Sequence, residues 1–167
     1  MQMSAGSNQI YFSQTSGGIC NISLQSGSGS NPGRIVIDSI GAKVSVTHLS
    51  GQTSLPTIAA GLGAGTTPTI SVGSGSTDLS GYVNITTGTT CSAAAVVATI
   101  TFNVPYFSAP RCIMIQPANA VTAALTPNAK HVYVNQAGIT TTTFDITAGA
   151  TALSDATAYQ WYYTVIQ

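Results

Sequence analysis

Charged side chains are scarce in this sequence. Only 5% of its 167 residues are Asp, Glu, Lys or Arg, and glutamate is absent altogether. Ordinary globular domains carry roughly 25% charged residues. The four basic residues are scattered and leave no electrostatic footprint for a nucleic acid. We therefore expect no nucleic-acid binding, and a surface built from Thr, Ser, Asn, Gln and Gly.

Paired cysteines at metal-binding or redox spacing are also missing. Cys20, Cys91 and Cys112 are odd in number and form no CxxC motif. We expect them to be small, buried or half-buried thiols. A Cys91–Cys112 bridge between neighbouring strands is the alternative, which the spacing permits but does not require.

Long apolar segments are absent as well. The N-terminal MQMSAGSNQIYFSQ has neither the basic start nor the apolar centre of a signal peptide. The longest apolar run, residues 91–100, is far shorter than a membrane span. We expect no membrane insertion and no export by the usual signal.

The glycine-rich stretch in residues 68–90, PTISVGSGSTDLSGYVNITTGTT, invites comparison with a phosphate-binding loop. Its glycines would let backbone N–H groups approach an anion closely. No lysine follows the loop, however, and no helical pattern begins after it. We interpret these glycines as turn residues between two strands.

Residues suited to catalysis do not form a recognisable pattern. His48 and His131 have no carboxylate or cysteine at ligand spacing, and we expect both to be strand residues. A Ser/His/Asp set needs no sequence adjacency, but no GxSxG elbow is present. Asp145 and Asp155 could flank a glycosidic bond only if folding brought them together. We predict no enzyme activity, no catalytic residue, no cofactor and no metal site.

What the sequence does contain is a series of short, β-branched runs separated by turn residues. The runs are residues 69–72, 82–87, 95–103, 111–116, 131–135, 142–147 and 159–166. Sustained helical periodicity is missing, although ANAVTAAL (118–125) could form one or two turns. Seven short strands in about a hundred residues predict an all-β fold, a sandwich or a barrel. We favour an antiparallel β-sandwich over residues 68–167.

The N-terminal third has a different character. Residues 1–33 are rich in Ser, Gly, Asn and Gln with interspersed apolar residues, which indicates an extended segment ordered by packing against a partner; a flexible tail is the alternative. Residues 34–49 predict a β-hairpin, because two β-branched runs flank Gly41 and Ala42. Several glycines and prolines then break the pattern, so we assign 34–67 to a hairpin and connector.

The aromatic residues of YQWYYTVI (159–166) would fall on two faces of one strand. Tyr159, Trp161 and Tyr163 share one face, while Gln160, Tyr162 and Thr164 share the other. The first set could stack on a sugar ring, but core or subunit packing is the more common use of such a stripe.

Several segments resemble a known family. These are PTISVGSGSTDLSGYVNITTGT, VVATITFNVPYFSAPRCIMIQPANAVTAAL, VYVNQAGITTTTFDI and LSDATAYQWYYTVIQ. Together they resemble the C-terminal β domain of tailed-bacteriophage fibre and head-fibre proteins, over roughly residues 66–167. The resemblance rests on structural motifs and carries no catalytic residues.

The resemblance implies a β-sandwich displayed on a virion by a homotrimeric fibre. Residues 1–33 would then dock on the capsid or another virion protein, and the outward domain would adhere to host-surface glycans. A chain this short favours a head fibre. A tail fibre or receptor-binding protein, and a monomeric carbohydrate-binding module, are the alternatives.

Overall fold

Along residues 57–166, β-branched and aromatic side chains alternate with small polar ones, and this alternation forms strands with one buried face. The computed structural model describes residues 54–125 and 130–167. The predicted hairpin at 34–49 and the predicted docking segment 1–33 lie outside the described residues. The strands are β1 (Thr57–Ala60), β2 (Thr69–Val72), β3 (Ser80–Thr86), β4 (Val96–Thr101), β5 (Cys112–Pro117), β6 (Val132–Val134), β7 (Thr143–Ala148) and β8 (Ala158–Ile166).

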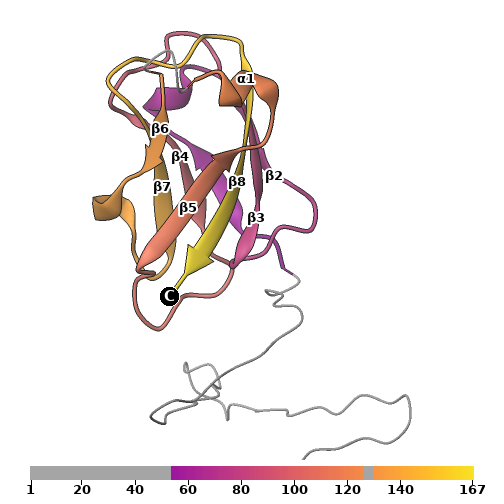
Figure 1. Ribbon diagram of the computed structural model, residues 1–167, viewed down its shortest axis with the longest axis vertical. Coiled ribbons are helices and arrows are strands. Elements are labelled where there is room, and N and C mark those ends of the chain that lie inside the picture. The colour runs from indigo at the N-terminus through magenta and orange to yellow at the C-terminus, as the bar shows by residue number, and fades with distance from the viewer. Residues whose placement is uncertain (1–53, 126–129) are drawn as a thin grey trace, which may run out of the picture. The chain divides into compact units, whose positions relative to one another are not determined.

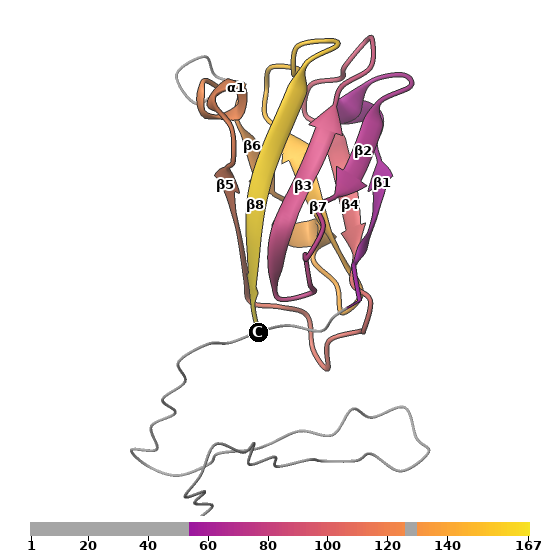
Figure 2. The ribbon, with the colours of Figure 1, turned by 90° about the vertical axis from the view of Figure 1, so that its right-hand side faces the viewer.

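Two four-stranded antiparallel sheets pack face to face, which confirms the predicted β-sandwich (Figure 1). The first sheet has the order β1-β4-β7-β6, and the second has the order β2-β3-β8-β5. In Figure 2 the second sheet faces the viewer and the first lies behind it. Each of the seven predicted runs overlaps one strand, β2 to β8.

The core lies between the sheets and is filled by alternate residues of the strands. In β8, the longest strand, Tyr159, Trp161, Tyr163 and Val165 are buried while the residues between them reach the surface. Phe144 of β7 packs against Tyr163 with ring centroids 5.8 Å apart, so the aromatic residues connect the two sheets. Burial of these large side chains is the main favourable term in folding.

The expected connector before residue 68 contains ordered structure that the sequence did not predict. β1 pairs with β4, and a 3₁₀ turn, η1 (Leu62–Ala64), follows it. Glycines are required here by close packing: a side chain at Gly63 would lie 2.7 Å from the carbonyl oxygen of Ala95. The glycines that indicated a linker instead let this segment approach β4.

The helical turn predicted within residues 118–125 is present as α1 (Ala120–Ala123). The side chain of Asn119 caps it by accepting a hydrogen bond from the Thr122 N–H. Thr122 Oγ1 in turn accepts from the backbone N–H of Gln160, which attaches the helix to β8. In the described part of the chain, no helix has the length and apolar character needed to cross a membrane.

The two cysteines in the described ranges lie at opposite ends of the sandwich and are both free. Cys112 begins β5 and pairs with Ile166 near the C-terminus. Cys91 lies in the loop that follows β3, at the end of the sandwich where β8 begins. The alternative of a Cys91–Cys112 bridge is therefore wrong. Cys91 is half-buried as expected, but Cys112 is exposed, because it faces outward from an edge strand.

Candidate functional site

The two aspartates considered for glycosidase chemistry are held in separate places. Asp145 on β7 accepts a hydrogen bond of 2.6 Å from the Thr99 hydroxyl. Asp155, in the loop before β8, accepts from the backbone N–H groups of Thr90 and Cys91, at 3.1 Å each. Each carboxylate already has a structural partner, and they do not form a catalytic pair.

The contacts between Asp155 and the loop at Cys91 shift the pKa of the Asp155 carboxyl and that of the Cys91 thiol. The N–H groups of Cys91 and Thr90 stabilise the charged carboxylate and hold the pKa of Asp155 below its usual range. Burial raises the pKa of the Cys91 thiol, and the Asp155 carboxylate raises it further. A thiol with a raised pKa is a poor nucleophile at neutral pH, so this pair stabilises a loop and does not activate a cysteine.

The glycine-rich loop is filled by side chains of the loop and of the neighbouring strands β3 and β8. The ring of Tyr82 lies over Gly73, where any side chain would collide with it. Ser76 Oγ accepts a hydrogen bond of 3.1 Å from the Tyr82 N–H, and Tyr163 donates one of 2.6 Å to the Thr77 carbonyl. The loop therefore forms a packed turn, as the sequence indicated.

Asp78, in the same loop, has a role that the sequence did not predict. Its carboxylate is buried and accepts hydrogen bonds of 2.7 and 2.9 Å from the backbone N–H groups of Asn103 and Val104. The Tyr106 hydroxyl donates to the Asp78 carbonyl at 2.9 Å. The segments GSTDLSG and TFNVPYFSAP thus form one structural unit, although about 25 residues separate them.

Two tyrosines that donate hydrogen bonds to the loop of Asp78 are held in their neutral form. Burial raises the pKa of Tyr163 far above its usual range. Burial also raises the pKa of Tyr106, and the nearby Asp78 carboxylate adds to this effect. Both hydroxyls act as hydrogen-bond donors to backbone carbonyls, which is a structural role.

The remaining candidate residue, His131, is exposed and lies one residue before β6. Its backbone carbonyl accepts a hydrogen bond from the Gly149 N–H. Among residues 54–125 and 130–167, His, Cys, Asp and Glu form no group of three suited to a metal ion. His48 lies outside the described residues.

The aromatic stripe of Tyr159, Trp161 and Tyr163 is part of the core. Trp161 is only 2% exposed and stacks on Tyr159 with ring centroids 5.6 Å apart. The favoured interpretation as core packing is confirmed, and these rings cannot form a sugar-binding platform.

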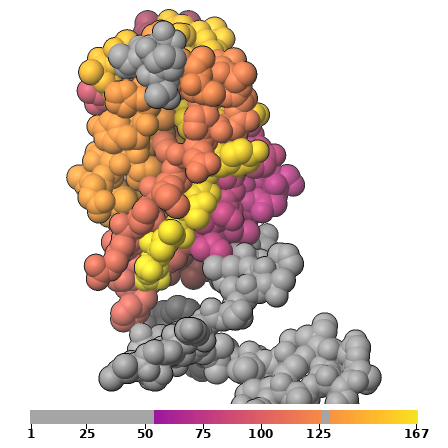
Figure 3. Space-filling model, viewed as in Figure 1, coloured from indigo at the N-terminus to yellow at the C-terminus, as the bar shows by residue number. Residues whose placement is uncertain are grey.

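The outer face of the second sheet carries a distinctive group of accessible side chains. We call it the tyrosine–amide face, formed by Ser71, Tyr82, Asn84, Met114, Gln116, Gln160, Tyr162 and Thr164. The four strands that supply these residues contain no charged residue and no histidine. In Figure 3, β8 is visible in yellow between β5 and β3.

Tyr162 lies at the centre of this face and is 54% exposed. In the strand register it is opposite Tyr82 on one side and Gln116 on the other. The rings of Tyr82 and Tyr162 meet edge to face, with centroids 6.3 Å apart. One ring thus supports the other while the face of the sheet stays open.

The amide groups of Gln160 and Asn84, beside the tyrosines, are fixed by hydrogen bonds. Gln160 donates through Nε2 to Asn84 Oδ1 at 2.8 Å, and Asn84 donates through Nδ2 to Ser71 Oγ at 3.3 Å. These hydrogen bonds connect three strands, β8, β3 and β2. They orient the amides and leave further donor and acceptor capacity on each.

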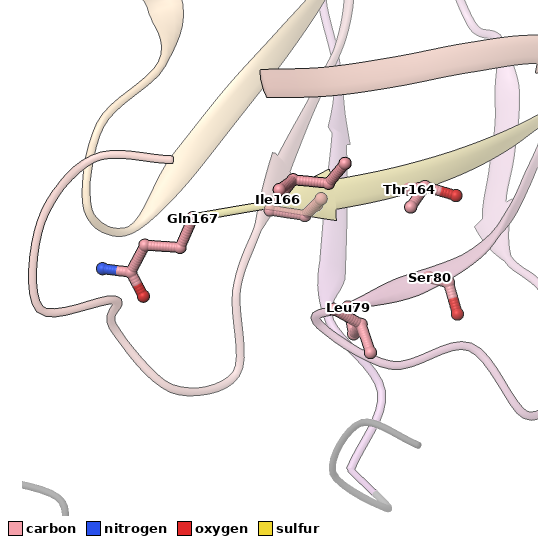
Figure 4. A pocket seen from close by; sticks show the side chains of 6 residues that line it. Leu79, Ser80, Thr164, Ile166 and Gln167 are labelled. Atoms are coloured by element: carbon pink, nitrogen blue, oxygen red, sulfur yellow. The ribbon is translucent and has the colours of Figure 1, made fainter. Parts of the chain in front are cut away.

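A groove lies at the end of this face nearest the C-terminus (Figure 4). Its volume is about 620 Å³, which is within the usual range of small-ligand sites. It is lined by Leu79, Ser80, Thr164, Val165, Ile166 and Gln167. Thr164 belongs to both the groove and the tyrosine–amide face, so the two surfaces are continuous.

The outer face of the first sheet differs in character. Its central strands present Thr99, Thr101 and Thr143 together with Asp145. One exposed aromatic residue, Tyr133 on β6, lies at its edge opposite Thr147. Of the two sheets, only the second combines accessible rings with oriented amides.

Comparisons with known proteins identify no relative: no family model, no curated protein and no solved structure matches this chain. Support for a function therefore comes from the geometry of the sandwich and from the resemblance in its sequence. Sequence reasoning had placed Tyr162 and Gln160 on a shared side of β8, but gave no means of finding Tyr82, Asn84 or Gln116 beside them.

Proposed function

We propose that this chain is a non-enzymatic structural protein of a virion, a short homotrimeric fibre attached to the head of a tailed bacteriophage. Residues 1–33 dock it on the capsid or another virion protein. The sandwich is displayed outward and adheres to host-surface glycans. The protein is assembled in the host cytoplasm and becomes part of the particle.

The observation that carries this proposal is the tyrosine–amide face, an uncharged and accessible surface on a rigid sandwich. The described carboxylates have structural partners: those of Asp78, Asp145 and Asp155 accept hydrogen bonds within the fold. Such an arrangement suits a binding or assembly module better than an active site. The motifs that resemble phage fibre domains form the loops and strands of this sandwich.

Two measurements test the proposal. Immunogold electron microscopy of intact particles, with an antibody against the sandwich, should label the head. Multi-angle light scattering of the purified full-length chain should give three times the mass of one chain. A clean monomer that labels no part of the particle would overturn the proposal.

A tail fibre is the second candidate, and labelling of the tail would favour it. A monomeric carbohydrate-binding module is the third, since the tyrosine–amide face requires no second copy to be complete. A monomeric chain that binds a defined glycan would support that alternative.

A further inference from the structure

We propose that the tyrosine–amide face binds a neutral oligosaccharide, with Tyr162 as the central contact. This inference rests on the adhesion role in the proposed function and assigns it to a ligand class and to named residues. The lack of charge on the four strands favours a neutral ligand. A charged ligand would lose hydration on this face without gaining an ion pair, which is unfavourable. Of the described charged residues, Arg111 directly precedes β5, and its backbone N–H donates to the Ile166 carbonyl at the end of β8. A neutral ligand avoids this cost.

The side chains of the face match the two kinds of surface that a sugar ring presents. The exposed ring of Tyr162 offers an apolar plane to the C–H groups of a pyranose. Gln116 is opposite Tyr162 in the register of the sheet, and Gln160 lies two residues before it on the same face of β8. Amides both donate and accept hydrogen bonds, as adjacent sugar hydroxyls require.

The geometry is also fixed before binding. The hydrogen bonds from Gln160 to Asn84 and from Asn84 to Ser71 orient the amides of Gln160 and Asn84, and the ring of Tyr82 meets that of Tyr162 edge to face. A face whose rotamers are already ordered loses little conformational entropy when a ligand binds. The groove beyond Thr164 extends the surface, so a chain of several sugar units fits better than a monosaccharide.

The size of the face distinguishes a sugar from a second copy of the protein. Four strands at about 4.8 Å spacing and six residues at about 3.3 Å give a plane of roughly 14 by 20 Å. That area is well below the roughly 800 Å² that each partner contributes to a stable protein interface. It is sufficient for a short oligosaccharide.

The test uses the full-length chain and soluble trisaccharides in saturation-transfer difference NMR. Maltotriose, cellotriose and chitotriose serve as neutral probes, and trigalacturonate serves as the acidic one. We expect transfer to at least one neutral probe and none to trigalacturonate. Absence of transfer to every neutral probe, or preference for the acidic one, would overturn the inference.

Variants then locate the site. Tyr162→Ala should weaken binding by roughly tenfold, whereas Tyr162→Phe should retain it, because the ring supplies the contact. Tyr133→Ala is the matched control, since Tyr133 is 44% exposed on the other sheet and should not affect binding. Thermal melts of all variants check that they are folded.

Other outcomes separate this inference from the proposed function. Unchanged affinity in Tyr162→Ala would overturn the site. Loss of the trimer in that variant would show that a second copy covers the face, which also overturns it. Labelling of the phage head is independent of sugar binding, so the structural role stands or fails on its own measurement.

Discussion

Asp78 illustrates how a single side chain can hold distant parts of this fold together. A buried carboxylate is costly unless its oxygens accept hydrogen bonds, and here the backbone of Asn103 and Val104 supplies them. The residue therefore fixes the path of the chain as it leaves β4.

Replacing Asp78 tests this role. We expect Asp78→Ala to lower the free energy of unfolding by about 2–4 kcal/mol, because the N–H groups of Asn103 and Val104 lose a buried, charged acceptor. Urea denaturation monitored by circular dichroism gives the value. Asp145→Ala is the comparison: its carboxylate is half-buried and accepts from a hydroxyl, so a smaller loss is expected. Equal losses would contradict the assigned role.

Asp155 predicts a dependence of stability on pH. Its pKa is lower in the folded chain than the value of about 3.9 expected when unfolded, so its contribution is fully present above pH 4. The contribution is lost as the pH falls from there through the folded pKa. The difference in melting temperature between the natural chain and Asp155→Asn should therefore be largest near neutrality and shrink in acid. A difference that grew in acid would contradict this sign.

The structural roles of individual polar residues were the least predictable from sequence. Asp78 and Asp155 bind backbone groups about 25 and 65 positions away, and a backbone N–H leaves no mark in a sequence. The positions of the partners depend on the assembled sandwich. The sequence could not show what either aspartate binds.

At the level of elements, β8 shows what alternation does predict. A strand with one face in the core and one on the surface divides its residues by parity, and the buried and exposed sets of β8 follow that division. Trp161 and Tyr162 are adjacent in the chain, yet one fills the core and the other belongs to the tyrosine–amide face.

This division yields a paired prediction. Trp161→Ala should cost about 3–5 kcal/mol of unfolding free energy, because it opens a large cavity in the core. Tyr162→Ala should cost about 1 kcal/mol or less, since its ring is half exposed. Chemical denaturation of both variants measures the contrast. Similar losses would mean that the ring of Tyr162 is covered by a partner.

Seven strands were predicted because their β-branched runs are dense and are bounded by turn residues. The missed strand, β1, has the sequence TIAA, with two alanines of low strand propensity and glycines immediately after it. It forms because β4 offers an unpaired edge. Tertiary pairing, and not local preference, decided its structure.

At the scale of the whole molecule, we propose separate roles for two parts of the chain: residues 1–33 dock on the particle, and the sandwich binds the host surface. Among residues 54–125 and 130–167, those that form the sandwich core all follow Thr57. Deleting residues 1–33 should leave the thermal unfolding transition of the sandwich unchanged. The same deletion should abolish incorporation of the protein into particles, measured by immunoblotting of purified virions. Normal incorporation would overturn the docking role of that segment.

The start of β1 and the C-terminus lie at the same end of the sandwich (Figure 2). The loops between β3 and β4 and between β7 and β8 lie at the opposite end. This polarity has a practical consequence for engineering. A peptide fused after Gln167 would emerge beside the point where the chain enters the domain. A peptide inserted between the exposed residues Ala150 and Thr151 would instead be presented at the far tip.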